Sequence, residues 1–389
     1  MTGTRRLAVV SHTPHHRTPD GLVGWGPTVT ELDHLARLFD EVVHVAPVHD
    51  GPPPASALRY TAANLRVEPA PAAGGDGLAA KLGLVAAVPR LVAATRRGLR
   101  DATVVHVRCP ANISGLALVA LRLSRDRRPC WAKYAGNWCP ERGDPWSYRL
   151  QRRWLRHGFG RLAVTVNGRG DDPEHVRAFA NPSLTDEDLA RGRAAAATKP
   201  DPADGVRLAF VGRVEAEKGA PEAVRTAIAV RRVGRPVHLA IVGDGPARDE
   251  CAALALAADL DITFHGWLDR TGVHDVLADT HVALLASRAS EGWPKVLSEA
   301  MAFGAVPVAS AVSSVPQVLA DTGAGVSVPG TDAEAHAAAV LALLADPAAL
   351  DAHRAAGLAA APAYGFTAYL AAVTALFAER WDLDLVTPT

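Results

Sequence analysis

The chain has 389 residues, of which 49% are hydrophobic and 21% are charged, and its formal net charge is zero. This composition excludes a disordered or fibrous protein, and the length predicts two domains because one ordinary hydrophobic core does not grow so large. No apolar run reaches the ~20 residues of a membrane span, the N-terminus has no apolar signal core, and the four cysteines show no zinc spacing. We therefore expect a cytoplasmic protein with reduced thiols and no bound metal.

Short runs rich in Val, Ile and Ala alternate with helical patterns along the chain, which predicts parallel sheets with crossover helices. The predicted strands are residues 7–11, 41–48, 104–108, 130–135 and 163–167 in the first half, and 206–212, 237–243, 262–266, 281–287 and 306–310 in the second. The expected fold class is α/β, with two doubly wound, Rossmann-like domains that face a central cleft, since ligands bind beyond the carboxyl ends of such strands.

Residues 181–205 are polar and interrupted by proline, and we interpret them as the domain boundary. We expect an N-terminal domain over 1–185 and a C-terminal domain over 186–365. The last helical pattern, within 366–389, either completes the second domain or crosses back to the first.

Positive charge is concentrated in the first half. Residues 81–161 contain 17 basic and 4 acidic side chains. Such a segment predicts either an anionic partner, which is a phosphorylated small molecule or a membrane face, or a set of solvated arginine-rich helix faces.

The segment SRASEGWPKVLSEAMAFG, residues 287–304, predicts a strand end, a loop and a helix from about Lys295 to Phe303, with Pro294 at its first position. The free N–H groups of that first turn, together with Lys295, form a potential anion site. Glu299 lies roughly 6 to 9 Å along the helix, which suits a ribose cis-diol beside a bound diphosphate. Glu291, in the loop, suits other hydroxyl groups. The alternative is that both glutamates are helix-end and solvated surface charges.

The segment LAFVGRVEAEKGAPEAV, residues 208–224, places Arg213 and Lys218 at the end of a predicted strand. Two cations five residues apart there are able to grip one diphosphate from two sides. The alternative is a solvated pair beside Glu215 and Glu217.

Four segments in a fixed order resemble the donor-binding half of retaining glycosyltransferases of the GT-B fold, family 4 (the group 1 type). They are Gly-Arg-x4-Lys-Gly at 212–219, AIVGDGPARDE at 240–250, FHGWL at 264–268 and Glu-x7-Glu at 291–299. The resemblance is close over about 205–330 and only architectural over the first half.

The resemblance implies that Arg213 and Lys218 neutralise the leaving nucleoside diphosphate, Glu299 binds the ribose and Glu291 binds the donor sugar. It also implies a mechanism without metal, cofactor or covalent intermediate, in which a phosphate oxygen takes the proton of the acceptor hydroxyl. The remaining donor-side residues are Gly212, Gly243, Gly245, Gly266, Trp267, Leu268, Gly292, Trp293, Pro294 and Val296.

The first half departs from the family pattern. The counterpart of the family's glycine-rich loop is SHTPHHRTPDGLVGWGPT, with Gly24 near the donor phosphates and a helix starting near Pro27. The histidines of this segment, His12, His15 and His16, either line the acceptor cleft or face solvent. The family's His-x-His pair is represented by His106 and Arg108, and Arg108 is either a ligand for an anionic group or a surface arginine. Further acceptor-side candidates are Lys133, Tyr134, Asn137 and Trp138.

Taken together, these features predict a bacterial, metal-independent hexosyltransferase that moves a sugar with retention from a nucleotide donor, with UDP-sugar favoured, to a hydroxyl acceptor. The acceptor is a small molecule or natural product, a glycan or a lipid-linked envelope component, and no nucleic acid partner is expected. The basic region 81–161 suggests peripheral contact with the inner face of the membrane. The alternatives are a sugar-nucleotide epimerase on the same scaffold and a non-catalytic nucleotide-sugar binding protein.

Overall fold

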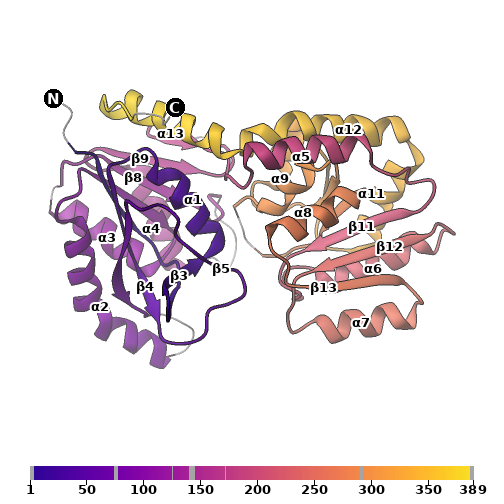
Figure 1. Ribbon diagram of the computed structural model, residues 1–389, viewed down its shortest axis with the longest axis horizontal. Helices are drawn as coiled ribbons and strands as arrows, with labels where there is room; N and C mark the ends of the chain where they lie inside the picture. Colours follow the sequence, from indigo (N-terminus) through magenta and orange to yellow (C-terminus); the bar gives the residue numbers. More distant parts are fainter. Residues whose placement is uncertain are drawn as a thin grey trace. The chain divides into compact units, whose positions relative to one another are not determined.

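The computed structural model describes residues 4–73, 78–124, 126–139, 145–170, 172–289 and 292–385. The chain forms two compact units, shown by the sequence colours in Figure 1. Unit 1 is Met1–Phe179 with Tyr369–Thr389, and unit 2 is Ala180–Ala368. The last helix therefore belongs mainly to unit 1, and unit 2 is continuous in sequence.

Unit 1 contains a largely parallel sheet with strand order β10-β9-β8-β7-β1-β4-β2-β3-β5, and β6 also pairs with β4. The strands are β1 (Arg6–Val10), β2 (His15–Thr18), β3 (Gly21–Trp25), β4 (Glu41–His49), β5 (Ala57–Arg59), β6 (Leu65–Pro71), β7 (Val104–Cys109), β8 (Cys130–Tyr134), β9 (Leu162–Val166) and β10 (Val176–Ala178). The pairs β2·β3 and β3·β5 are antiparallel, which gives the sheet a short mixed edge.

Helices cover both faces of this sheet, so its central strands are buried on both sides, as parallel strands require. The helices are α1 (Gly26–Ala36), α2 (Leu78–Leu99), α3 (Asn112–Leu123), α4 (Trp146–His157) and α13 (Phe366–Trp381). One apolar cluster joins α2, α3 and α4 to one face. A second cluster joins α1 and α13 to the other face, where Phe377 packs against Trp131 and Phe39.

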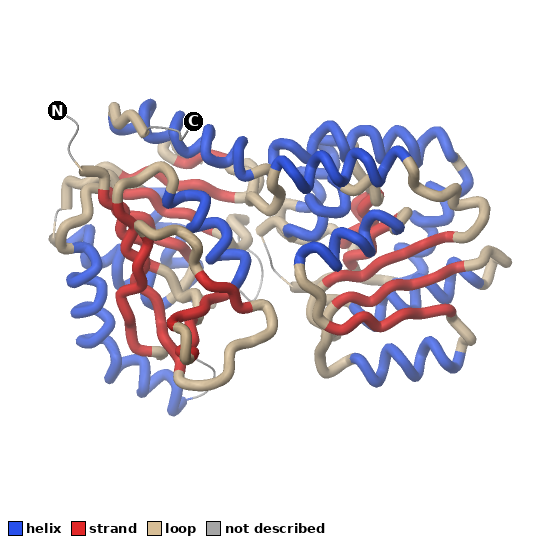
Figure 2. The backbone as a smooth tube through the Cα atoms, in the orientation of Figure 1, coloured by secondary structure: helices blue, strands red, loops and turns tan. Residues whose placement is uncertain are grey.

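Unit 2 is a six-stranded parallel sheet with order β13-β12-β11-β14-β15-β16, and its strands and covering helices are drawn in red and blue in Figure 2. The strands are β11 (Val206–Val211), β12 (Val237–Val242), β13 (Asp261–Gly266), β14 (Val282–Leu285), β15 (Val306–Ser310) and β16 (Val326–Val328). The helices are α5 (Asp186–Ala197), α6 (Ala220–Arg231), α7 (Arg248–Ala257), α8 (Arg270–Asp279), α9 (Lys295–Ala302), α10 (Val315–Thr322), α11 (Ala333–Ala345) and α12 (Pro347–Ala360), with a 3₁₀ turn at Ala361–Tyr364.

All ten predicted strands are present, and the structure adds β2, β3, β5, β6, β10 and β16. Residues 181–205, interpreted as the domain boundary, lie at the start of unit 2, and α5 occupies the middle of that segment. The Thr185 side chain accepts a hydrogen bond from the Asp188 N–H, while the Asp188 carboxylate accepts one from the Thr185 N–H. This capping box starts the helix.

Within the described ranges, no single helix is both long and apolar enough to cross a membrane. Helix α11 and the stretch Pro347–Tyr364 reach that length and polarity only together, and they are bent by 102°.

Candidate functional site

Three neighbouring strands of unit 2 end at glycines on the same edge of the sheet. The Gly212 N–H donates to Val242 O (2.9 Å), and the Gly243 N–H donates to Gly266 O (2.7 Å). A Cβ on Gly243, whose φ is +116°, would lie 1.9 Å from Gly212 O. Only glycine fits this close approach, so this edge presents bare backbone to whatever binds there.

The residues that follow these strands continue the same edge. A Cβ on Gly245 would lie 2.5 Å from Val214 O, so a second glycine is also required by packing. Trp267 is 50% exposed directly after β13, and Leu268 is half-buried. An exposed indole at a strand end is able to stack on a planar ligand.

The two predicted cations lie on one loop between β11 and α6. Arg213 is exposed and pairs with Glu215 (3.0 Å). Burial, followed by repulsion from Arg213, lowers the pKa of the Lys218 ammonium. The two positive charges are therefore close enough to repel each other, which is compatible with joint binding of one diphosphate.

This loop is attached to the segment that leaves β14. A Cβ on Gly219, whose φ is +78°, would lie 1.9 Å from Ala286 O. The Arg288 N–H and the Ser287 hydroxyl both donate to Glu217 O, at 2.8 and 3.2 Å. The loop of Arg213 and Lys218 is therefore held beside the chain that leads to α9. Glu291, predicted to bind the donor sugar, lies outside the described residues.

Helix α9 begins at Lys295, as predicted, and Pro294 is its N-cap rather than its first helical residue, with φ −66° and ψ 119°. Among the described residues, no side chain caps the helix, so its first N–H groups are available to an anion. Gly304 follows the C-terminus with φ +69°, which confirms the predicted end of the helix.

The side chain of Trp293, a predicted donor-side residue, packs into the interior of unit 2. Its indole is buried, donates to Ser298 Oγ (2.6 Å) and stacks on Tyr364 with ring centroids 5.5 Å apart. Gly292 O accepts a hydrogen bond from Ser314 Oγ (2.7 Å). These contacts fix the loop from inside, so Gly292 and Trp293 offer main-chain groups rather than a side chain to a ligand.

Glu299 is half-buried on α9, about 6 Å along the axis from Lys295 at 1.5 Å per residue. Burial raises the pKa of its carboxyl above the usual range, whereas His274, Lys295 and Arg270 lower it. Among the described residues, no side chain or main-chain group donates a hydrogen bond to this carboxylate. A part-buried carboxylate whose lone pairs are unused is suited to accept hydroxyl groups from a ligand. Val296, on the same first turn, is half-buried.

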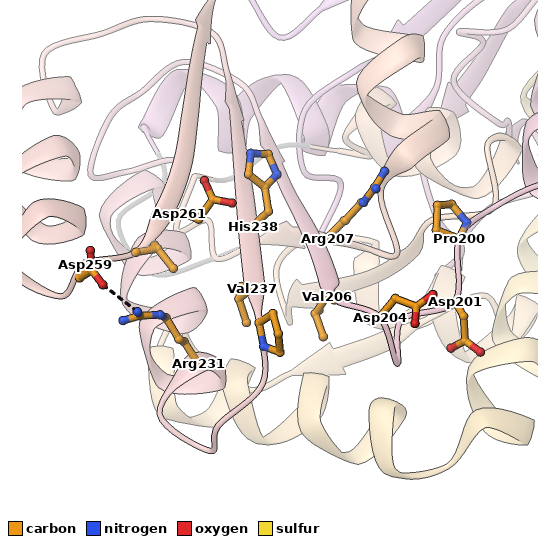
Figure 3. A pocket seen from close by; sticks show the side chains of 13 residues that line it. Pro200, Asp201, Asp204, Val206, Arg207, Arg231, Val237, His238, Asp259 and Asp261 are labelled. Carbon is orange, nitrogen blue, oxygen red and sulfur yellow. Dashed lines mark hydrogen bonds and ion pairs between the residues drawn. The ribbon is translucent and has the colours of Figure 1, made fainter.

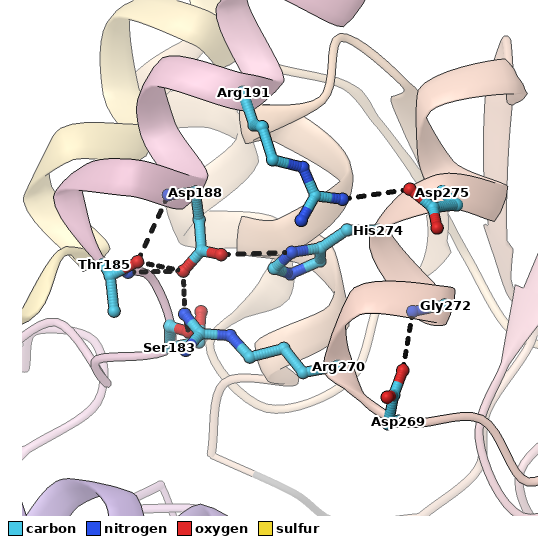
Figure 4. Close-up of polar contacts among 9 residues, drawn as sticks. All are labelled: Ser183, Thr185, Asp188, Arg191, Asp269, Arg270, Gly272, His274 and Asp275. Atoms are coloured by element: carbon cyan, nitrogen blue, oxygen red, sulfur yellow. Dashed lines mark hydrogen bonds and ion pairs between the residues drawn. The ribbon is translucent and has the colours of Figure 1, made fainter.

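A polar cluster that the sequence did not reveal lies close enough to Glu299 to influence its pKa. Figure 4 shows the members of this cluster. Asp188 on α5 pairs with Arg270 and with His274 Nδ1 (3.3 Å), both on α8. Arg270 also donates to Ser183 O (2.9 Å). The sequence signal for this cluster was Thr185-x-x-Asp188, which is a capping box followed by a helical pattern.

In unit 1, the two predicted acceptor-side cations are engaged inside the domain. Arg108 forms two hydrogen bonds with Glu31, at 2.7 and 3.2 Å, and Lys133 Nζ donates to the same carboxylate at 2.7 Å. The Tyr369 hydroxyl on α13 donates to it as well (3.0 Å). Both readings of Arg108, a surface arginine and a free ligand for an anion, are therefore corrected, since burial beside a carboxylate satisfies its charge.

Sequence reasoning missed Glu31, although a signal was present. Thr28, Glu31, Leu32 and Leu35 share the buried stripe of α1. A glutamate on that stripe requires a buried cation.

Further acceptor-side candidates also face the interior. Arg152 donates to the Tyr134 hydroxyl and to Asn137 O, and Trp138 Nε1 donates to Asp172. His106 is fully buried, stacks on Trp131 at 3.9 Å, and its pKa is lowered to about 3, mainly by burial. It is therefore neutral. Burial and these contacts give Tyr134 and Trp138 a structural role, whereas His106 bonds to Trp131 O through Nδ1 (3.0 Å) and its buried Nε2 has no hydrogen-bond partner among the described residues.

The expected glycine-rich loop is a β-hairpin, formed by β2 and β3, which corrects that interpretation. Gly24 is a strand residue, and a Cβ there would lie 2.7 Å from His15 Nε2. His15 is buried, bonds to the Tyr60 hydroxyl (3.0 Å), and burial lowers its pKa to about 4. His16 stacks on His49 (5.5 Å). Within the described part of the chain, no group of three His, Cys, Asp or Glu side chains is arranged to hold a metal.

His12 is the one of these three histidines that borders a cavity. The pocket has a volume of about 530 Å³ at the carboxyl ends of β1, β4, β6 and β7, and its polar lining comes from His12, His49, Asn112 and Tyr148. Burial and the charge of Arg108 lower the pKa of His12, so the ring is mainly neutral near pH 7. The pocket also includes the uncapped start of α3. It offers hydrogen-bonding groups beside apolar walls, which suits a hydroxylated ligand.

A pocket of about 680 Å³ in unit 2 lies at the other edge of the sheet, where β11, β12 and β13 begin. Figure 3 shows Val206, Val237 and Asp261 on these strand starts, with Arg231 paired to Asp259. We assign the ligand site to the carboxyl edge instead, because that is where strand ends, helix N-termini and converging loops provide binding groups.

The two Rossmann-like units define the class of protein: the fold is GT-B. The solved structures with this fold include sucrose-phosphate synthase from Thermosynechococcus elongatus, with a TM-score of 0.68, 19% identity and coverage of 96% of this chain and 98% of that one. HepE from Anabaena in complex with UDP has a TM-score of 0.65 at 14% identity, with coverage of 96% and 100%.

Residues 196–359, within unit 2, match the family described as Glycosyl transferases group 1. The chain is 33% identical over 202 residues to phosphatidyl-myo-inositol mannosyltransferase of Mycolicibacterium smegmatis, which covers 51% of this chain and 47% of that protein. It is 31% identical over 216 residues to alpha-D-kanosaminyltransferase of Streptomyces kanamyceticus, covering 52% and 56%. The chain thus spans about half the length of the curated relatives it matches.

Proposed function

We propose that the chain is a retaining glycosyltransferase that takes a sugar from a nucleotide donor bound by unit 2. The observation that carries the proposal is the carboxyl edge of its sheet, where Arg213, Lys218 and the uncapped start of α9 surround bare glycine turns. Glu299 stands about one helical turn further on with its carboxylate unused. Cations and helix N–H groups suit a diphosphate, and an acidic acceptor of hydroxyl groups suits the ribose.

In this mechanism the protein acts mainly on the leaving group. Negative charge grows on the diphosphate as the sugar bond breaks, and Arg213 and Lys218 stabilise it. A phosphate oxygen removes the proton of the acceptor hydroxyl on the same face, which needs no metal, no cofactor and no protein base. Neutralising Lys218 by Lys218→Met is expected to lower kcat by about 100-fold or more, because its charge matters most in the transition state.

UDP-sugar is the favoured donor, and the acceptor is a small molecule, a glycan or a lipid-linked molecule. HepE, which shares the fold, was solved with UDP and with UDP-glucose. The pocket lined by His12, His49, Asn112 and Tyr148 is the acceptor site that unit 1 offers, in place of the buried candidates.

Calorimetric titration with UDP, GDP and ADP tests the donor site. Glu299→Gln is expected to weaken the nucleotide that binds by about 1.5–3 kcal/mol, because charge-assisted hydrogen bonds are lost while the side-chain shape is kept. The matched control is Glu334→Gln, an exposed glutamate on α11 paired with Arg232. The donor site is rejected if no nucleotide binds, or if both variants bind like the wild type.

The pH dependence provides a second readout of the same residue. Since burial raises the pKa of Glu299, the carboxylate is protonated at a higher pH than an ordinary glutamate. Nucleotide affinity is expected to fall as the pH decreases toward that pKa, and Glu299→Gln should remove this part of the pH dependence. Product analysis with donor alone separates the alternatives, because an epimerase converts it without an acceptor and a binding protein leaves it unchanged.

A further inference from the structure

Part of the positive charge predicted for residues 81–161 is paired inside unit 1. Arg108 and Lys133 share Glu31, Arg156 pairs with Asp172, and Arg128 pairs with Asp126. Other arginines of this segment are exposed on several elements. The side chains that surround the exposed arginines decide what the region binds.

One groove combines exposed arginines with an exposed leucine. It has a volume of about 890 Å³ and lies between α2 and α3, which run side by side on one face of the sheet of unit 1 (Figure 1). On α3, Leu116, Val119 and Leu123 follow one stripe at i, i+3 and i+7. Leu116 and Val119 are half-buried, whereas Leu123 is 77% exposed. An exposed leucine that continues an apolar stripe is a potential contact with an apolar partner.

The arginines lie on the rim of this apolar stripe. Arg96 and Arg100, four residues apart on α2, line the groove, and Arg122 and Arg127 adjoin its residues Leu123 and Arg128. All four are exposed, and none forms an ion pair with the residues that the structure describes. Two acids are near in sequence: Asp126 is held by Arg128, and Asp101 is exposed beside Arg100. The rim therefore has a clear excess of positive charge.

We propose that this groove docks on the surface of an anionic lipid bilayer. An apolar strip bordered by long basic side chains matches the boundary between acyl chains and anionic headgroups, where Leu123 inserts and the arginines meet phosphate groups. The described lining contains no aromatic side chain, which disfavours single-stranded nucleic acid, whose bases stack on aromatic rings. The inference is independent of the proposed transferase chemistry.

The position of the groove determines which end of the strands in unit 1 faces the bilayer. Leu99 and Leu123 end their helices just before β7 and β8 begin, so the groove lies at the amino ends of these strands. The pocket of His12 lies at the carboxyl ends. Docking through the groove therefore leaves that pocket uncovered, and the bilayer serves to hold the protein rather than to close its site.

Vesicle sedimentation tests the proposal, using phosphatidylcholine alone and phosphatidylcholine with phosphatidylglycerol, at low and high salt. The chain is expected to sediment only with the anionic vesicles, and binding should weaken as salt rises. Removing two rim charges in the Arg96→Gln, Arg100→Gln double variant is expected to lower the partition coefficient roughly tenfold or more. Leu123→Ser is expected to lower it by about fivefold.

Matched controls separate a local surface from general charge. The double variant Arg37→Gln, Arg193→Gln removes the same charge from exposed sites outside the groove, and Leu256→Ser removes a leucine that is 84% exposed on α7. Both are expected to bind vesicles like the wild type, and circular dichroism melting checks that every variant is folded. Equal loss in groove and control variants overturns the proposal, as does equal binding to neutral vesicles. A dimer in free solution that Leu123→Ser dissociates would assign the groove to a second copy instead.

Discussion

The carboxyl edges of the two sheets differ in how their charged side chains are paired. In unit 1, Arg108 at the end of β7 and Lys133 at the end of β8 both form ion pairs with Glu31 of α1. In unit 2 the cations that follow β11 lie beside glycine turns, and Glu299 keeps an unused carboxylate. The same strand-end position therefore serves stability in unit 1 and carries the proposed ligand site in unit 2, and the packing around it distinguishes the two.

The largest expected effect comes from removing the carboxylate that neutralises unit 1. Glu31→Ala leaves Arg108 and Lys133 buried without their shared partner, so the free energy of unfolding of unit 1 should fall by about 3–5 kcal/mol. Hydrogen exchange resolved by unit measures it. The control is Glu379→Gln, which breaks an exposed pair with Arg177 and should cost at most about 1 kcal/mol. Equal effects of the two variants would contradict a structural role for Glu31.

The next effect concerns the glycine edge of unit 2. Gly243→Ala is expected to destabilise this unit by about 2–4 kcal/mol and to abolish nucleotide binding, since its Cβ would collide with Gly212 O. Gly330 also has positive φ (+73°), but a Cβ there meets nothing within 4 Å. Gly330→Ala is therefore the control for backbone strain alone, and nucleotide titration with both variants separates strain from collision. If the two behave alike, close packing at Gly243 is not what the edge requires.

Lowering the pH should destabilise unit 1 more than unit 2. Burial lowers the pKa of His106 to about 3, that of His15 to about 4 and that of His44 well below 6.5, so all three are neutral in folded unit 1. The unfolded chain binds protons below pH 6.5, so stability falls as pH decreases from 6.5 toward 4, by about 1 kcal/mol per pH unit for each proton.

In unit 2 the pKa is lowered for His281 and His336, again mainly by burial. Unit 1 is therefore expected to lose stability more steeply in scanning calorimetry between pH 7 and pH 5. His106→Gln should reduce that slope by about one proton. Parallel losses in the two units would argue against the three-histidine explanation.

The smallest effect tests the helix at the start of unit 2. Thr185→Ala removes one half of the capping box of α5 and should cost about 1 kcal/mol in chemical denaturation of unit 2. Thr198→Ala, at the other end of the same helix, is expected to stay within about 0.5 kcal/mol of the wild type.

The donor edge was predictable from the sequence because its parts are local. A strand, a glycine, a cation and a helix lie close together in the sequence between Val206 and Ala220, and again between Val282 and Lys295, so the pattern can be recognised locally. The roles assigned there, including those of Arg213, Lys218 and Glu299, stay predictions until nucleotide binding is measured.

The interior of unit 1 was not predictable in the same way. The partner of Arg108 lies 77 residues away, and that of Tyr369 lies 338 residues away, so no window of sequence contains both members. The β2–β3 hairpin was also missed, because Gly21 and Gly24 favour a loop locally, and β3 becomes a strand through its pairing with both β2 and β5.

The return of α13 to unit 1 has a consequence for the order of folding on the ribosome. Unit 2 is one uninterrupted stretch, Ala180–Ala368, and it is synthesised before most of α13. Until α13 is added, the apolar face of α1 and Trp131, which Tyr369 and Phe377 cover in the folded protein, remains open, and Glu31 lacks one of its hydrogen-bond donors. The N-terminal unit is therefore the last to receive all of its residues, although its synthesis begins first.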